Sequence, residues 1–252
     1  MAKPGVLFRH AETGASYIDR FQPEQANLEF LSFGEYSLPP AGKTRPASYP
    51  GLETLLFTWQ GSAAVHVGEA TYSLQTYDVL YIPKGAEYAI SNSAASPAKL
   101  FATRAPAENV HPTFHSKFSD IRKDEKRIRH LKGKDVFMMF DVSEPADKLV
   151  AGYTFCEPFA RSWPPHNHTD QEEVYVFIKG HGAMEVYESP ETLTFVREVG
   201  EGDAVSIPFL NYHPVFSQEA PLEFIWCIAG ARYWVGDKNK DFMHGKAASI
   251  TT

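Results

Sequence analysis

The sequence is poor in cysteine, in long apolar runs and in helical periodicity, and each shortage excludes a class of protein. Its 252 residues include only two cysteines, Cys156 and Cys227, and neither belongs to a C-x-x-C pair, so no disulfide framework is expected. No apolar run approaches the roughly 18 residues of a membrane span, and the first ten residues lack the apolar core of a secretion signal. We therefore expect a soluble, cytoplasmic protein with no membrane partner.

Positive charge is also in short supply. The chain has 24 lysines and arginines against 31 acidic residues, which gives a net charge of −7 with histidine neutral. The overall field does not favour nucleic acid, so we expect no such partner, and an anionic ligand would need a local positive pocket. The hydrophobic content of 43% is sufficient for a sizeable core.

Strand patterns dominate what the sequence does contain. Its 18 prolines and 17 glycines separate short stretches rich in Val, Ile, Phe, Tyr and Thr, which is the spacing of strands rather than helices. The clearest expected strands are 54–59, 63–67, 79–82, 148–155, 173–178, 204–207 and 222–228. Short helices are expected only near 22–30 and in the charged middle of the chain. The sequence therefore predicts an all-β fold.

A weak internal repeat indicates two related halves. Four positions correspond at an offset of 125, three of them with the same residue: Asp78, Val79, Ile82 and Pro83 match Asp203, Ala204, Ile207 and Pro208. Upstream, the stretch that begins at Glu53 aligns with the one that begins at Glu173. Repeats define an architecture before local detail does, so each half is expected to be an all-β unit of about a hundred residues.

One part of the second half concentrates residues that bind metals. His166 and His168 are two residues apart, so in an extended strand both imidazoles face the same side. Glu173 begins the next strand, where a short turn can bring it beside the pair, and His213 follows in a later strand. Three imidazoles and one carboxylate then converge, a set that suits zinc, iron, manganese, nickel or cobalt. Without a cation, turning these groups inward would cost several kcal/mol.

This spacing resembles the signature of the cupin superfamily. The cupin pattern is H-x-H, four residues, E, six residues and G, and later G, five residues, P, four residues and H. Here it is formed by His166, His168, Glu173 and Gly180, and then by Gly202, Pro208 and His213. One departure is Leu210, which stands where many cupins have glycine. The resemblance implies a double-stranded β-helix, or jelly-roll, barrel, and with the repeat it implies two tandem barrels, a bicupin.

The whole chain resembles the bicupin sugar-acid isomerases, the family of 5-keto-4-deoxyuronate isomerase and 5-deoxyglucuronate isomerase. The resemblance is strongest at 165–175, 206–213 and 224–230. It implies an aldose–ketose interconversion of a deoxy sugar acid in carbohydrate catabolism. It also implies one divalent ion per chain, zinc in the first place, on the four ligands above. Residues 81–88 look like the 5-deoxyglucuronate branch, but the short segment from His168 to Glu173 looks like the other, so the substrate stays open.

The repeat and the motif together suggest domain limits. We expect an N-terminal cupin barrel without metal ligands (1–118), a charged connector (119–145), a metal-binding C-terminal barrel (146–236) and a polar tail (237–252). The first barrel lacks the chelate because Pro46, Ser48 and Tyr88 align with the three histidines. The basic run 122–134 is interpreted as a solvated connector, since acidic residues interrupt it, the alternative being a docking strip for an anion or a subunit.

Isomerisation needs a group that moves a proton between carbons. Strand alternation with Glu173 inward puts Tyr175 inward and Glu172 outward. Tyr175 is therefore the first candidate for the proton handler, and Glu172 is the second because a bulge would reverse the parity. By the same alternation Asn211 accompanies His213 into the cavity, where it could bond a substrate hydroxyl.

The carboxylate of a sugar acid calls for a planar guanidinium, and two arginines flank the motif. Arg161 precedes it and Arg232 follows the last strand, so both are candidates for substrate binding. His181 is interpreted as a hairpin residue rather than as a fifth ligand.

Two other functions stay open, a cupin dioxygenase with a three-histidine, one-glutamate site and a non-catalytic sugar-binding bicupin. A homo-oligomer is also plausible.

Overall fold

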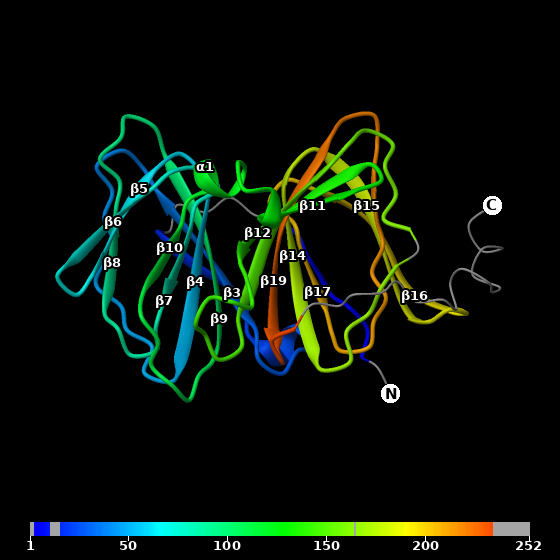
Figure 1. Cartoon of the computed structure of the whole chain (residues 1–252), viewed down its shortest axis with the longest axis horizontal. Coiled ribbons are helices and arrows are strands. Elements are labelled where there is room, and N and C mark those ends of the chain that lie inside the picture. The colour runs from blue at the N-terminus through cyan, green and yellow to red at the C-terminus, as the bar shows by residue number, and fades with distance from the viewer. Residues whose placement is uncertain (1–2, 11–15, 164, 234–252) are drawn as a thin grey trace.

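A computed structural model describes residues 3–10, 16–163 and 165–233, and its regular structure is almost entirely strand (Figure 1). The all-β prediction is confirmed. Within these ranges the helices are three short segments, η1 (Pro23–Ala26), α1 (Phe118–Ile121) and η2 (Glu125–Arg127), close to the two regions where short helices were expected. None of the described helices has the length and apolarity needed to cross a membrane. The polar tail predicted at 237–252 lies outside the described residues.

The amino-terminal unit consists of two sheets that face each other. The larger sheet has the strand order β10-β7-β4-β9-β3-β2, and the smaller has the order β6-β5-β8. The strands are β2 (Tyr17–Phe21), β3 (Ser32–Leu38), β4 (Leu52–Gln60), β5 (Ala63–Val67), β6 (Ala70–Leu74), β7 (Val79–Ile82), β8 (Tyr88–Ser91), β9 (Ala98–Pro106) and β10 (Phe114–Ser116). Buried aliphatic side chains such as Leu56, Val65 and Leu100 fill the space between them.

The carboxy-terminal unit repeats this arrangement. Its larger sheet has the order β1-β17-β14-β19-β13-β12-β11, and its smaller sheet has the order β16-β15-β18. The strands are β1 (Leu7–Phe8), β11 (Ile128–Leu131), β12 (Lys134–Phe140), β13 (Val150–Cys156), β14 (Gln171–Lys179), β15 (His181–Ser189), β16 (Thr192–Gly200), β17 (Ala204–Ile207), β18 (Val215–Ser217) and β19 (Leu222–Gly230). Strand β1 pairs with β17, so the start of the chain helps to build this second unit.

The segment 119–145 is not the separate connector that its charge predicted. Strand β12 pairs with β13 and strand β11 pairs with β12, so this stretch forms one edge of the seven-stranded sheet. The physical reason is that β12 is apolar on both faces. Val136 and Met138 pack into the core of the carboxy-terminal unit, whereas Met139 and Phe140 pack toward the amino-terminal unit. The charged residues of β11 occupy the edge, where water can reach them.

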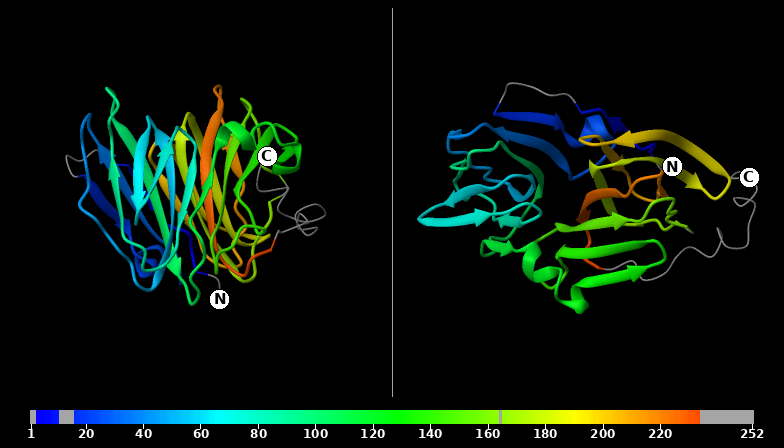
Figure 2. Two further views of the ribbon diagram at one scale, coloured as in Figure 1. Left: turned by 60° about the vertical axis from the view of Figure 1, so that its left-hand side comes forward. Right: turned by 90° about the horizontal axis from the view of Figure 1, so that it is seen from above.

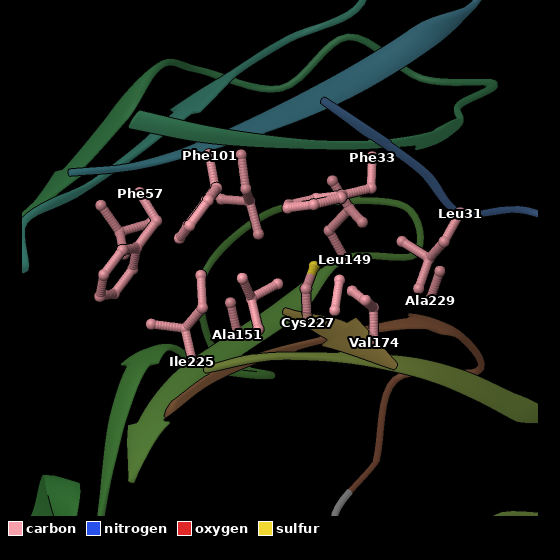
Figure 3. Packing of buried hydrophobic residues seen from close by; sticks show 14 of the residues in the cluster. Leu31, Phe33, Phe57, Phe101, Leu149, Ala151, Val174, Ile225, Cys227 and Ala229 are labelled. Carbon is pink, nitrogen blue, oxygen red and sulfur yellow. The ribbon is translucent and has the colours of Figure 1, made fainter. Parts of the chain in front are cut away.

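The two units lie side by side and bury the outer faces of their large sheets against each other (Figure 2). Phe33 and Phe101 of the amino-terminal unit face Val174 and Cys227 of the carboxy-terminal unit, as Figure 3 shows. The central strands are therefore buried on both faces, between the two sheets of their own unit on one side and at this interface on the other. This explains why they read as nearly continuous apolar runs rather than as alternating patterns.

Two buried glutamates tie the units together in a reciprocal way. Glu172 on β14 accepts backbone hydrogen bonds from residues 29, 30 and 31 at 2.6, 2.7 and 2.6 Å. Glu53 on β4 accepts backbone hydrogen bonds from residues 147, 148 and 149 at 2.9, 2.7 and 2.9 Å. The first loop leads into β3 and the second leads into β13. Each unit therefore holds the loop of the other with one carboxylate, and we call this pair the glutamate clasp.

The clasp corrects the alignment of the two halves by one residue. Glu53 was aligned with Glu173, but its role is that of Glu172. The pairing agrees, because Thr54 lies opposite Ile82 and Glu173 lies opposite Ile207, and Ile82 and Ile207 are equivalent in the repeat. Thr54 is therefore the counterpart of Glu173. A shift of one residue exchanges the two faces of a strand, so the amino-terminal unit has a hydroxyl, not a carboxylate, at this position.

Candidate metal centre

Four side chains from three segments of the carboxy-terminal unit converge, as predicted. His166 and His168 precede β14, Glu173 lies on β14, and His213 precedes β18. One ligand atom from each residue lies within 4.8 Å of those of the other three. Oε2 of Glu173 is 3.3 Å from Nε2 of His168 and 3.1 Å from Nε2 of His213. Atoms this close together can surround a single ion.

The donor atoms themselves test whether a metal fits. Nε2 of His168, Nε2 of His213 and Oε2 of Glu173 are all buried, and none has a partner in hydrogen-bond geometry among the residues that the structure describes. Buried polar atoms without partners are rare in folded proteins, because each costs about 1–3 kcal/mol. A divalent cation would satisfy all three at once. Imidazole and carboxylate donors in this number are also the ligands that zinc and similar metals take.

The electrostatics of the cluster favour the protonation states that a metal needs. Burial, reinforced by repulsion from His213 and His168, lowers the pKa of His166 well below its usual value. Burial opposes ionisation of Glu173, but the adjacent imidazoles of His168 and His213 outweigh it and lower the pKa of this carboxyl group. A neutral imidazole and an ionised carboxylate are the forms that bind cations.

Hydrogen bonds at Nδ1 orient the imidazole rings of His168 and His213. Nδ1 of His168 is 2.7 Å from Oε1 of Gln171, whose amide nitrogen donates to the carbonyl groups of Ala231 and Tyr233. Nδ1 of His213 is 2.9 Å from the carbonyl oxygen of Asn211. Both rings therefore direct Nε2 toward the cluster. Gln171 was missed in the sequence, although it lies two residues before Glu173 and so on the same face of β14.

The departure from the cupin pattern at Leu210 leaves the turn intact. Leu210 has a φ of 68°, in the left-handed region that favours glycine. Its side chain is 42% exposed, so it meets no steric obstacle from the core. Its backbone N–H donates to the carbonyl oxygen of His168 at 2.6 Å and thus connects the two halves of the motif. The turn exists at the cost of backbone strain, which a glycine would relieve.

Tyr175 lies next to the cluster, as strand parity predicted. It is 7% exposed, and its ring contacts that of His213 edge-on with centroids 5.5 Å apart. It also stacks on Phe224 at 4.6 Å. Burial, followed by the charge of Glu173, raises the pKa of Tyr175 well above its usual value. The phenol is therefore a proton donor near the cluster at neutral pH.

Glu172, the second candidate for the proton handler, is excluded from that role by its position. Its carboxylate belongs to the glutamate clasp and is fully buried on the opposite face of β14 from Glu173. The predicted parity was correct, and no bulge reverses it. Both oxygens already accept backbone N–H groups. Glu172 therefore stabilises the interface between the units.

Two of the three predicted substrate-binding residues also have structural partners. Arg232 donates to the carbonyl oxygens of Leu149, Ala146 and Asp141 at 3.1, 3.2 and 2.6 Å. The side-chain amide of Asn211 donates to the carbonyl oxygens of Lys3, Pro208 and Phe209 at 2.8, 3.1 and 3.2 Å. The guanidinium group of Arg232 is therefore used by the fold, through contacts with distant loops that strand alternation does not reveal. Oδ1 of Asn211, in contrast, is buried and has no hydrogen-bond partner among the described residues, so a bond from Asn211 to a substrate hydroxyl stays a prediction.

Arg161 differs, since part of its guanidinium group is buried without an acceptor. It stacks between Trp163 and Phe216, at 4.0 and 4.7 Å from their ring centres. Its Nε and Nη2 atoms have no hydrogen-bond partner among the described residues. Lys134, which the sequence analysis did not select, donates to Ser162 Oγ at 3.0 Å, and its charge helps to lower the pKa of His166. Arg161, on the segment before the histidines, and Lys134, on β12, thus place two cations beside the histidines.

Comparison with known proteins adds the family. The profile of the KduI/IolB family matches residues 6–244. The chain belongs to the KduI/IolB family. It is 24% identical over 234 residues to a 5-deoxy-glucuronate isomerase of Geobacillus thermodenitrificans (strain NG80-2), and the match covers 83% of each sequence. It is 27% identical over 194 residues to a 4-deoxy-L-threo-5-hexosulose-uronate ketol-isomerase of Bacillus subtilis (strain 168), covering 72% of this chain and 68% of the relative.

A solved structure carries the same fold. The IolB-like protein of Salmonella typhimurium LT2 superimposes with a TM-score of 0.78 at 19% sequence identity, covering 96% of this chain and 98% of that one. At this identity the likeness establishes the fold alone. The cupin-like, all-β architecture expected from the motif is thereby confirmed.

Proposed function

We propose that this protein is a metal-dependent ketol-isomerase of a deoxy sugar acid. The observation that carries the proposal is the cluster of His166, His168, Glu173 and His213, whose ligand atoms lie within 4.8 Å of one another. The facing atoms of the last three residues are buried without a hydrogen-bond partner among the described residues. Membership of the KduI/IolB family supports it, because the matched relatives are named as isomerases of 5-deoxyglucuronate and of a deoxy-hexosulose uronate.

The chemistry of such an isomerase suits this site. His166, His168, Glu173 and His213 would hold a divalent ion, which would supply positive charge to stabilise the negative charge that develops on the substrate oxygens. The protein's own residues exclude water around the cluster and present a proton donor beside it. We assign the proton transfer to the hydroxyl of Tyr175, which lies beside His213 and whose raised pKa keeps it protonated.

The acidic end of the substrate needs a cationic partner, and two groups are available. Arg161 offers buried N–H groups without acceptors, and Lys134 lies close enough to His166 to affect its pKa. A carboxylate would satisfy the planar guanidinium in a bidentate manner. We propose that Arg161 binds the substrate carboxylate and that Lys134 adds charge at the same end.

The remaining features of the proposal follow from the family and the repeat. We propose that the two units are tandem cupin barrels, the second one catalytic, with one divalent ion per chain and zinc as the first choice. The strands suggest limits near 17–116 for the first barrel and 128–230 for the second, with β1 added to the second. We also propose that the enzyme acts in the cytoplasm and as a homo-oligomer.

The test is turnover of defined substrates followed by NMR. Purified protein is incubated with 5-deoxyglucuronate and with 5-keto-4-deoxyuronate, and the isomerised product is identified from its carbon resonances. The expected result is conversion of one of them by the zinc-loaded protein and none by the His168→Ala variant. A protein that leaves both compounds unchanged in every metal-loaded form would contradict the proposal.

Oxygen consumption separates the main competing function. A cupin dioxygenase with the same ligands would take up oxygen and would work with iron or nickel rather than zinc. Turnover with zinc under anaerobic conditions therefore excludes the dioxygenase, and turnover that requires oxygen excludes the isomerase. Any turnover of either compound excludes a purely sugar-binding bicupin.

A further inference from the structure

The amino-terminal barrel carries a buried arginine next to the position where the other barrel has its ligand cluster. Arg104 on β9 lies opposite Thr54, the counterpart of Glu173, as Ile228 on β19 lies opposite Glu173. Tyr88 stands at the place of His213 in the repeat. Arg104 is 2% exposed and belongs to the inner face of the sheet, next to the barrel core. A fixed cation thus occupies the region where the other half gathers metal ligands.

Four tyrosines surround this guanidinium group. Nη1 of Arg104 donates to the hydroxyl of Tyr17 at 2.7 Å, and Nη2 donates to the hydroxyls of Tyr88 and Tyr36 at 3.1 and 3.3 Å. The ring of Tyr49 covers the group, with its centre 4.0 Å away. We call Arg104 and these four residues the tyrosine cage.

The charge inside the cage has no direct counter-anion among the described residues. No carboxylate there forms an ion pair with Arg104, and its Nε is buried without an acceptor. Burial raises the pKa of Tyr17 and Tyr36, so these phenols remain neutral and do not balance the charge. The acid connected to the cage is Asp19, which accepts from the Tyr17 hydroxyl at 2.6 Å and therefore contacts Arg104 only indirectly.

Such an arrangement is costly unless something binds to it. A buried cation without a paired anion, and a buried N–H without an acceptor, each lower the free energy of unfolding. An apolar residue, such as Ile228 at the equivalent position, would carry no such cost. The backbone accommodates the cage, since a Cβ at Gly34 would lie 2.3 Å from the Tyr17 hydroxyl. The cage therefore holds a fixed positive charge with one unused hydrogen-bond donor, the Nε–H of Arg104.

We propose that the tyrosine cage of the amino-terminal barrel binds a small monocarboxylate, with one carboxylate oxygen on the Nε–H of Arg104. The single positive charge matches a monoanion better than phosphate, which is usually held by several cations. A hydrogen bond between a guanidinium N–H and a carboxylate oxygen is charge-assisted and therefore among the strong ones, even when only one is formed. The partly buried rings of Tyr17 and Tyr49 form the side of the cage that is nearest to solvent, and they would have to admit the ligand. This site is independent of the proposed isomerase activity.

The test follows the Nε–H resonances of arginine by NMR in the wild-type protein. Protein labelled with ¹⁵N-arginine is titrated with sodium acetate and with sodium D-glucuronate, while sodium chloride keeps the ionic strength constant. The Arg104 signal, identified by its loss in Arg104→Lys, should shift and saturate with a midpoint of about 1 mM or lower. If that variant fails to fold, Tyr49→Phe identifies the signal by its altered position, since the ring covers the guanidinium.

Two internal comparisons make the result decisive. The Nε–H of Arg232 already donates to the Leu149 carbonyl oxygen, so its signal should stay in place during the titration. The Arg104 shift should persist in His168→Ala, which separates the cage from the metal centre. The proposal is overturned by an Arg104 signal that does not move, that moves without saturating, that moves equally with inorganic phosphate, or that no longer responds in His168→Ala.

Discussion

The glutamate clasp makes a quantitative prediction that separates structure from catalysis. Replacing Glu172 with glutamine keeps the size of the side chain but leaves a single acceptor oxygen. In the wild type, Oε1 accepts the N–H groups of Phe30 and Leu31 and Oε2 accepts that of Glu29. In Glu172→Gln one oxygen can keep two donors, while the amide NH₂ group faces the third.

The size of the effect follows from these three bonds. A buried N–H that loses its acceptor costs about 1–3 kcal/mol, and the two remaining bonds lose the advantage of a charged acceptor, about 1 kcal/mol each. The free energy of unfolding should therefore fall by about 4 kcal/mol, a large part of the 5–15 kcal/mol of a typical domain. For a chain of this length such a loss lowers the midpoint of thermal unfolding by roughly 8–16 °C.

Chemical and thermal unfolding of wild type and variant measure this change, and turnover is measured at a temperature where both are folded. Glu69→Gln, on an exposed turn of the amino-terminal unit, is the matched control and should unfold like the wild type. We expect kcat of Glu172→Gln to stay within a few-fold of the wild type. Unchanged stability together with a fall in kcat of at least about 100-fold, the usual effect of losing an acid–base group, would refute this reasoning.

Three further predictions concern the metal centre. His168→Ala should lose most of the bound metal in elemental analysis, whereas the wild type should hold one equivalent per chain, and two equivalents would contradict the single site. Tyr175→Phe should reduce kcat by about 10²–10⁴-fold with the metal content unchanged, and near-normal turnover would remove Tyr175 from the mechanism. Gln171→Ala should weaken metal affinity by about 10–100-fold, because the ring of His168 loses its orienting partner. A competition assay with a chelator measures this affinity, and an unaltered value would show that Gln171 serves only the fold.

The candidate metal ligands could be predicted from sequence because their geometry is mostly local. His166 and His168 lie in an irregular segment just before β14 rather than in the expected strand, yet their short spacing to Glu173 still brings the three side chains together. Strand parity along β14 also placed Tyr175 correctly beside them. The same local logic missed the hydrogen bonds that the amide nitrogen of Asn211 and the guanidinium group of Arg232 form with loops far away in the chain. No periodicity records such contacts.

The alignment of the two halves failed for a different reason. Each central strand is apolar on both faces, so alternation does not reveal which residue points inward. Two adjacent acids, Glu172 and Glu173, then made Glu53 an apparent match for either one. The reciprocal hydrogen bonds with the loops at 29–31 and 147–149 resolve the choice. In the same way, charged neighbours at the edge of the sheet concealed strands β11 and β12.

The reciprocal hydrogen bonds of Glu53 and Glu172 limit how this protein could be divided into fragments. A fragment that ends after β10 would contain Glu53 without the backbone N–H groups that bind it, and it would expose its side of the apolar interface between the units. The other fragment would also lack β1. Neither piece is expected to stay soluble when produced alone, and mixing them should be needed to recover metal binding. The carboxy-terminal unit, which contains the candidate metal cluster, is thus not expected to fold independently, since the amino-terminal unit supplies part of its scaffold.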